Sequence, residues 1–189
     1  MDPNSSHLYH ESFVTEKGRI VVWKSADYLQ NMNGSGKKKE LERQEVIRML
    51  NTLGYSLTDL CYKDSGQPML AANSKEYISI SHSHGWFAIY LASEPIGIDI
   101  EIERAKIVEG KDWFINEAEL PKYLTQHELQ LMWGAKEAYY KKLEGQIEDL
   151  RKEVTLKQIE ASTLLVEHQN KQAQLCYRLL GDVYLVWTV

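Results

Sequence analysis

The sequence holds little of what several protein classes depend on. Its two cysteines, Cys61 and Cys176, are too few for a disulfide framework or a four-ligand zinc site and are typical of a reducing compartment. No apolar run approaches the ~18 residues that a membrane span needs. Positive charge is not in excess, since 22 Lys and Arg against 27 Asp and Glu give a net charge of −5, which argues against broad nucleic-acid binding. We therefore expect a soluble, cytoplasmic protein with neither nucleic acid nor a membrane as partner.

What is present is the composition of a folded protein. Hydrophobic residues make up 43% and charged residues 26% of the 189 residues, and these values exclude a disordered chain. The length suits one domain or two small lobes. The regular patterning lapses between about Ala105 and Lys111. The sequence therefore predicts an N-terminal lobe over residues 1–104 and a C-terminal lobe over residues 105–189.

Periodicity predicts strands and helices in both halves. Alternating or β-branched runs predict strands over residues 20–23, 77–81, 86–91, 96–103, 175–180 and 183–189. Helical spacing of apolar residues predicts helices over residues 37–53, 116–124 and 128–143. A flexible turn at residues 33–36 precedes the first helix, and Gly181-Asp182 suits a type II′ hairpin turn between the last two strands. This mixture predicts an α+β fold.

The strand over residues 96–103 has one apolar and one acidic face. Its isoleucines alternate with Gly97, Asp99, Glu101 and Glu103. Asp99 and Glu101 lie about 7 Å apart along the strand, so both carboxylates can reach one divalent cation. Oxygen ligands favour Mg²⁺ or Mn²⁺ over zinc. A solvated outer face of an antiparallel strand explains the same alternation, and the pattern alone leaves both interpretations open.

Three further features could serve an anionic ligand. Glu137 and Lys141 lie one turn apart on the predicted helix and share a face. Residues 79–86, Ser-Ile-Ser-His-Ser-His-Gly-Trp, can donate several hydrogen bonds to a phosphate. Lys37-Lys38-Lys39 is a local cationic run in an acidic chain. Each feature also has an ordinary structural explanation: a surface ion pair, a turn histidine and a solvated charge run.

The order and spacing of these features resemble the 4′-phosphopantetheinyl transferase superfamily in its two-lobed, surfactin-synthetase-activating form. The matching motifs are Gly66-Gln67-Pro68, Ile-Ser-Ile-Ser-His-Ser at 78–83, Gly-Ile-Asp-Ile-Glu at 97–101 and Trp-Gly-Ala-Lys-Glu-Ala-Tyr-Tyr-Lys at 133–141. The resemblance implies two similar lobes, each an antiparallel sheet packed against a long helix, with the active site in the cleft between them. It also implies Mg²⁺-dependent transfer of the 4′-phosphopantetheine group of coenzyme A to a serine of an apo acyl or peptidyl carrier protein. Adenosine 3′,5′-bisphosphate would be released.

The resemblance further implies roles for particular residues. Asp99, Glu101 and Glu137 are the implied ligands of Mg²⁺, with Mn²⁺ as a substitute. Lys141 is the implied phosphate-contacting lysine, and Glu137 is our candidate for the base that accepts the serine proton, directly or through water. The residues implied at the coenzyme A site are Lys38, Lys39, Gly66, Gln67, Pro68, Ser81, His82 and Lys141.

The chain departs from the family pattern in several places. Members usually carry Lys or Arg between the glycine and proline matched here by Gly66 and Pro68, and the neutral Gln67 predicts weaker coenzyme A binding. Gly134 stands where a small polar residue or cysteine is common, and the sequence leaves open which of Glu117 and Glu119 matches the family's acidic position.

Two other functions fit parts of the same pattern. One is an impaired member of the family that binds coenzyme A or a carrier protein without transfer, as the neutral Gln67 suggests. The other is a metal-dependent phosphodiesterase, because paired carboxylates with a lysine recur in nucleases. The pathway of the carrier protein, whether fatty acid, polyketide or nonribosomal peptide synthesis, stays open.

Overall fold

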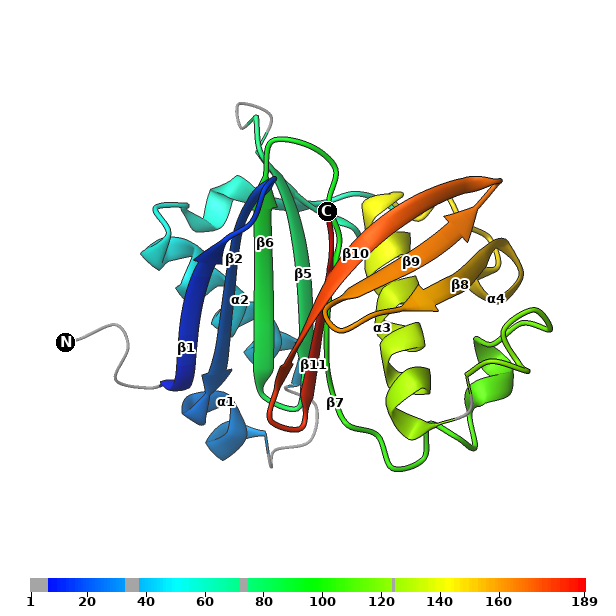
Figure 1. Cartoon of the computed structure of the whole chain (residues 1–189). Helices are drawn as coiled ribbons and strands as arrows, with labels where there is room; N and C mark the ends of the chain where they lie inside the picture. Colours follow the sequence, from blue (N-terminus) through cyan, green and yellow to red (C-terminus); the bar gives the residue numbers. More distant parts are fainter. Residues whose placement is uncertain (1–6, 33–37, 72–74, 124) are drawn as a thin grey trace. The chain divides into compact units, whose positions relative to one another are not determined.

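The structure is a computed structural model that describes residues 7–32, 38–71, 75–123 and 125–189. Contacts within the chain divide it into two compact units, Met1–Glu94 and Pro95–Val189. Each unit combines helices with an antiparallel sheet (Figure 1). The predicted α+β fold class is therefore confirmed.

The first unit is built on a four-stranded sheet in the order β1-β2-β6-β5. Its strands are β1 (His7–Val14), β2 (Gly18–Ser25), β5 (Tyr77–Ser83) and β6 (Trp86–Ala92). The helices α1 (Ala26–Asn31) and α2 (Lys38–Thr52) cover one face of this sheet (Figure 1). A 3₁₀ turn, Leu57–Asp59, leads into a separate hairpin of β3 (Leu60–Tyr62) and β4 (Pro68–Leu70).

The helix α2 follows the predicted apolar stripe. Val46, Met49 and Leu50 are buried and pack against Trp23 and Phe87 of the sheet. The prediction of a helix over residues 37–53 is confirmed for the described part, whereas Lys37 and the turn predicted at 33–36 lie outside the described residues. The same face also buries Glu42 and Glu45, which the apolar stripe does not indicate. The first unit therefore carries two carboxylates inside a helix-sheet interface.

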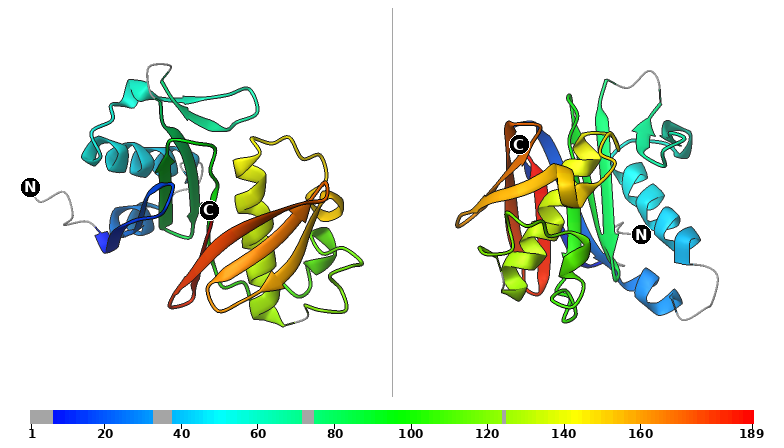
Figure 2. Two further views of the ribbon diagram at one scale, coloured as in Figure 1. Left: turned by 45° about the horizontal axis from the view of Figure 1, so that its top comes forward. Right: turned by 90° about the vertical axis from the view of Figure 1, so that its right-hand side faces the viewer.

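The second unit holds a five-stranded sheet in the order β7-β11-β10-β9-β8. Its strands are β7 (Ile98–Ile102), β8 (Val154–Ile159), β9 (Thr163–His168), β10 (Lys171–Leu180) and β11 (Val183–Thr188). The long helix α3 (Gln126–Lys142) packs on this sheet and the short helix α4 (Leu150–Glu153) precedes β8 (Figure 2). Thr125 caps α3 in a capping box with Glu128. Leu129, Met132 and Ala135 of α3 join strand residues in one core.

The boundary between the units differs from the one the sequence predicts. The structure divides the chain after Glu94, whereas the predicted first lobe runs to residue 104. The difference arises because β7 pairs with β11, with Asp99 opposite Val186, and so belongs to the second unit. A break in local patterning cannot locate such a boundary, because strand pairing is decided by residues far along the chain.

One predicted helix is wrong, and several strands escape prediction. Residues 117–122 form turns rather than the helix predicted over 116–124, whose last residue lies outside the described residues. The Asn116 Oδ1 atom accepts the backbone N–H groups of Ala118 and Glu119 at 3.0 and 3.2 Å. Side-chain capping of this kind competes with helix formation, and Pro121 has no N–H to donate. The strands β1, β3, β4, β8 and β9 were not predicted from the sequence. Among the helices in the described ranges, none is long and apolar enough to cross a membrane.

The other predicted elements are confirmed. The strands over residues 20–23, 77–81, 86–91, 175–180 and 183–189 correspond to β2, β5, β6, β10 and β11, and the helix over 128–143 corresponds to α3. The predicted strand over residues 96–103 begins at Ile98. Gly181 adopts a φ of 70° at the first position of the β10–β11 turn, as the predicted turn type requires.

We expect Ile98→Ala to lower the free energy of unfolding by about 2–5 kcal/mol, because it leaves a cavity in place of a side chain with 0% exposure. Urea unfolding measures the change. Ile102→Ala, at the partly buried end of the same strand, is the matched control and should cost less. Equal losses in the two variants would contradict the burial of Ile98.

Candidate functional site

A pocket of about 520 Å³ lies in the first unit, where α2, the β3–β4 hairpin and β5 meet. Its lining combines cationic, aromatic and apolar side chains around one carboxylate. The lining residues are Lys39, Glu42, Arg43, Val46, Tyr62, Gly66, Pro68, Ile80 and His82. Three segments that are distant in the sequence thus contribute to one cavity.

Four residues that the sequence predicts for coenzyme A line this pocket together: Lys39, Gly66, Pro68 and His82. Ser81 does not line it. Neighbouring residues of a strand project to opposite faces of the sheet, so Ser81, only 7% exposed, lies on the face away from His82. Lys38 and Gln67 are likewise absent from the lining.

The hairpin that forms one wall of the pocket depends on Gly66. The loop closes through two backbone hydrogen bonds, from Gly66 N–H to Lys63 C=O at 2.8 Å and from Lys63 N–H to Gln67 C=O at 2.9 Å. Gly66 has a φ of 83°, a conformation that residues with a side chain rarely adopt. After the turn, Pro68 begins strand β4 and pairs with Tyr62 on strand β3. The Gly-Gln-Pro motif is therefore a turn motif whose backbone forms one wall of the pocket. The Gln67 Oε1 atom is buried without a hydrogen-bond partner.

The same pocket is also lined by Glu42, Arg43 and Tyr62, which were not predicted from the sequence. Arg43 follows Lys39 by four residues, and this spacing places both cations on one face of a helix. That signal is present in the sequence once the helix is accepted. Burial raises the pKa of the Tyr62 hydroxyl, and the positive charge of Arg43 opposes the rise. Tyr62 is therefore a neutral aromatic surface beside a guanidinium group.

The ring of His82 is surrounded on two sides. Its Nδ1 atom lies 3.4 Å from Oε1 of Glu42, and its ring centroid is 5.8 Å from that of Phe87. The Tyr28 hydroxyl donates to the same Glu42 oxygen at 3.2 Å. Burial and the charge of Glu42 raise the pKa of Tyr28 to about 12, so this hydroxyl keeps its proton. Glu42 thus accepts from one neutral donor and faces one titratable ring.

A second group of charges lies in the second unit, where α3 crosses β7. Lys141 Nζ is 2.9 Å from Asp99 Oδ1 and donates to the Ile98 carbonyl at 3.0 Å. Gly97 permits this approach, because a Cβ atom there would lie 1.8 Å from the carbonyl oxygen of Ala138 on α3. Gly134 acts similarly, since its Cβ would lie 2.8 Å from Val186 Cγ2. The close contact places Asp99 beside α3.

The carboxyl group of Glu137 belongs to this second group. Burial raises its pKa, Asp99 and Glu101 raise it further, and Lys141 and Arg104 oppose the rise. Glu101 forms an ion pair with Arg104, whose guanidinium lies 5.9 Å from the Trp133 ring centroid. Asp99 and Glu101 are therefore close enough to Glu137 to affect its pKa. Arg104 was not predicted.

These carboxylates offer the donor chemistry that Mg²⁺ prefers, namely hard oxygen atoms with negative charge. Within the described residues, no set of three or more His, Cys, Asp or Glu side chains is arranged to hold a metal ion. Asp99 and Glu101 instead face the cations Lys141 and Arg104. Asp99, Glu101 and Glu137 therefore have the donor chemistry for a magnesium ion but are not arranged around a common ion position in this structure.

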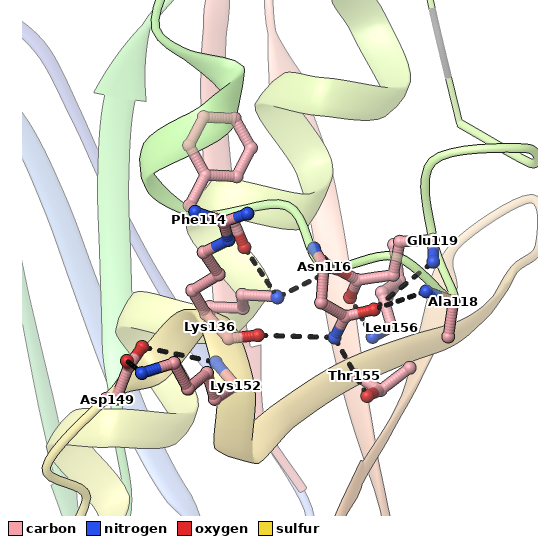
Figure 3. A network of polar contacts seen from close by, with 10 residues as sticks. Phe114, Asn116, Ala118, Glu119, Lys136, Asp149, Lys152, Thr155 and Leu156 are labelled. Carbon is pink, nitrogen blue, oxygen red and sulfur yellow. Dashed lines mark hydrogen bonds and ion pairs between the residues drawn. The ribbon is translucent and has the colours of Figure 1, made fainter.

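Lys136, whose role the sequence left open, is a structural residue (Figure 3). It is 0% exposed, and its Nζ atom donates to the Phe114 carbonyl at 2.7 Å and to Glu119 Oε2 at 2.9 Å. Glu119 also accepts the backbone N–H groups of Asn116, at 2.8 Å, and Leu156. Burial lowers the pKa of Lys136, and the charge of Glu119 opposes that effect. The pair ties the turns at 114–119 and strand β8 to α3.

The same contacts distinguish the two glutamates that the sequence left open. Glu119 is fully buried beside Lys136, whereas Glu117 is exposed. The acidic position that matters for this fold is therefore Glu119. Comparison of the sequence with models of protein families and with curated proteins found no match to either.

We expect Lys136→Met to lower the free energy of unfolding by about 3–5 kcal/mol, because it leaves the buried Glu119 carboxylate without its cation. Chemical denaturation measures the loss. Lys122→Met, at an exposed position, is the control and should change stability little.

The double variant Lys136→Met/Glu119→Gln should recover part of that loss, since a neutral amide can still accept a backbone N–H group. Wild-type stability of Lys136→Met would show that the buried pair contributes nothing to the fold.

Proposed function

We propose that the protein transfers the 4′-phosphopantetheine group of coenzyme A to a serine hydroxyl of an apo carrier protein. The observation that carries this proposal is the pocket of the first unit. It brings together Lys39, Gly66, Pro68 and His82, which the family resemblance assigns to coenzyme A from three separate segments of the chain. Such convergence supports a shared ligand more strongly than any one of the motifs does.

The pocket suits the adenosine 3′-phosphate end of coenzyme A. Lys39, Arg43 and His82 line it and supply donors for an anionic oxygen. A guanidinium group binds phosphate through two parallel hydrogen bonds. Arg43 thereby places a cation in the pocket. Between Gly66 and Pro68, where members of the family usually carry Lys or Arg, this chain has the neutral Gln67.

The charges of the second unit suit the reacting pyrophosphate. When bound, Mg²⁺ held by Asp99, Glu101 and Glu137 supplies charge neutralisation at phosphate oxygens. Lys141, already beside Asp99 at 2.9 Å, offsets negative charge on the leaving group. A carboxylate oxygen of Glu137 accepts the proton of the carrier serine, directly or through water.

The reaction forms one bond and breaks one. The serine oxygen attacks the β-phosphorus of coenzyme A as its proton passes to Glu137. The bond from that phosphorus to the bridging pyrophosphate oxygen breaks, and adenosine 3′,5′-bisphosphate leaves. Binding without transfer is the second candidate, favoured by the ion pair between Lys141 and Asp99 if that contact persists with coenzyme A bound.

Transfer is tested by mixing the protein with coenzyme A, Mg²⁺ and a panel of apo acyl and peptidyl carrier proteins. Mass spectrometry should detect the added phosphopantetheine, and Asp99→Asn should abolish the addition because it removes one charged ligand. Glu103→Gln is the matched control, since Glu103 is exposed and contacts Gln126. Coenzyme A binding without modification of any carrier would favour the impaired alternative, and undiminished transfer by Asp99→Asn would contradict the proposed metal site.

A second prediction concerns Arg43. We expect Arg43→Gln to weaken coenzyme A binding about ten-fold at low salt and to make the affinity less sensitive to ionic strength, because one charge-assisted contact is lost. Isothermal titration calorimetry at two salt concentrations measures both effects. Arg48→Gln is the control, since Arg48 lies on the same helix, pairs with Asp27 and Glu45 and does not line the pocket. Equal effects in the two variants would argue against a direct contact from Arg43.

A further inference from the structure

Glu42 is an unexpected residue in a pocket for an anion. Its side chain lines the cavity beside Lys39 and Arg43, yet the residue is only 9% exposed. A carboxylate in this position repels a bound phosphate, and burying its charge costs free energy unless it is paired. A pocket that served only to attract anions would be better without it. Glu42 therefore requires a separate explanation.

The contacts of Glu42 supply one. Its Oε1 atom lies 3.4 Å from His82 Nδ1 and 3.8 Å from Lys38 Nζ, and it accepts from the Tyr28 hydroxyl at 3.2 Å. Lys38 is 71% exposed, so solvent screens that charge. Tyr28 is neutral. The carboxylate of Glu42 is therefore a negative charge at short range from His82.

This arrangement fixes both the orientation and the protonation of the ring. A carboxylate facing Nδ1 favours a proton on that nitrogen, and the second ring nitrogen can then bear a proton only as imidazolium. Phe87 lies against the ring at 5.8 Å between centroids and limits its rotation. His82 also lines the pocket, where an imidazolium can donate to a phosphate oxygen.

We propose that Glu42 is a positioning residue that keeps His82 in the protonated form and orientation that bind the 3′-phosphate of coenzyme A. The inference rests on the proposed function, because it takes coenzyme A as the ligand of the pocket. Its consequence is that recognition of the 3′-phosphate extends to higher pH than an unassisted histidine would allow. Glu42 thereby acts on coenzyme A through another residue.

The other groups named near His82 either disfavour a positive charge on its ring or are themselves neutral. Lys39 and Arg43 on α2 line the same pocket, and their positive charges disfavour a further charge on the ring. Tyr62 on β3 and Tyr28 on α1 both have a raised pKa and stay neutral across the range in which histidine titrates. The negative charge of Glu42, which faces the ring, opposes the effect of these two cations.

The test compares coenzyme A with dephospho-coenzyme A, which lacks the 3′-phosphate, by calorimetric titration between about pH 5.5 and 8.5. The ratio of the two affinities isolates recognition of the 3′-phosphate. The 3′-phosphate itself loses its second proton within this pH range, an effect shared by all variants, so each profile is compared with that of His82→Gln. Relative to that reference, the wild-type ratio should fall as pH rises, because the imidazolium is lost. Glu42→Gln should move the midpoint of the fall to lower pH by about one unit.

The affinities of Glu42→Gln and wild type should cross. At pH 5.5, toward which the imidazolium is favoured in both proteins, the variant should bind coenzyme A at least as tightly, because a repulsive charge is gone. At pH 8 it should bind several-fold more weakly. Weaker binding at every pH would mean a purely structural role, and tighter binding at every pH would mean simple repulsion. Either result overturns the proposal.

Two further variants complete the design. Glu45→Gln is the matched control, because Glu45 is buried on the same helix at 4% exposure and does not line the pocket, so its profile should equal that of the wild type. His82→Gln, at a side chain 41% exposed, should leave only the pH dependence that comes from ionisation of the 3′-phosphate itself, and a retained wild-type profile would overturn the proposal even if Glu42→Gln failed to fold. Absence of coenzyme A binding by the wild type would instead overturn the proposed function itself.

Discussion

The close approach of α3 to β7 is the constraint on which the second unit depends. It requires the absence of a side chain at Gly97, where a Cβ atom would lie 1.8 Å from the Ala138 carbonyl oxygen. Because the strand passes this near to the helix, Lys141 reaches both Asp99 and the Ile98 carbonyl. Alanine at position 97 would push the helix away and separate these charges. The glycine is therefore as much a part of the candidate site as the acidic residues beside it.

Buried charge has two different uses in this protein. Lys136 and Glu119 are both 0% exposed and satisfy each other and three backbone groups, of Phe114, Asn116 and Leu156. Such a pair is weak evidence for added stability, since desolvation offsets much of its attraction, but it fixes the path of an irregular segment. Glu42 is buried where a ligand would arrive, and its charge acts on a neighbour that titrates. One arrangement defines structure and the other adjusts binding.

The local periodicity of apolar residues predicted those helices and strands whose sequences are themselves periodic. The helices α2 and α3 and the apolar strands follow repeats that a helix or a sheet imposes on every buried element. The helix predicted over residues 116–124 was wrong because the Asn116 side chain accepts the backbone N–H group of Ala118 there. The strand β7 was assigned to the wrong unit because its partner β11 lies far along the chain. The predicted site mixed Ser81 with His82, although the alternation of a strand separates them. Arg43 could have been predicted from i,i+4 helical spacing. Glu42 could not, because nothing in the sequence distinguishes it from the other polar residues of the helix.

The net charge of the chain and the charge within its pocket bear on different kinds of ligand. A total of −5 argues against an extended polyanion as partner, because many phosphates must be neutralised at once. It does not argue against a single phosphorylated metabolite, since the field within a pocket is set by the few charges that line it. Lys39 and Arg43 supply a constant positive charge there, while the part that depends on protonation comes from His82, which faces Glu42. A pocket with a fixed and a variable component can hold an anion firmly without ceasing to respond to pH.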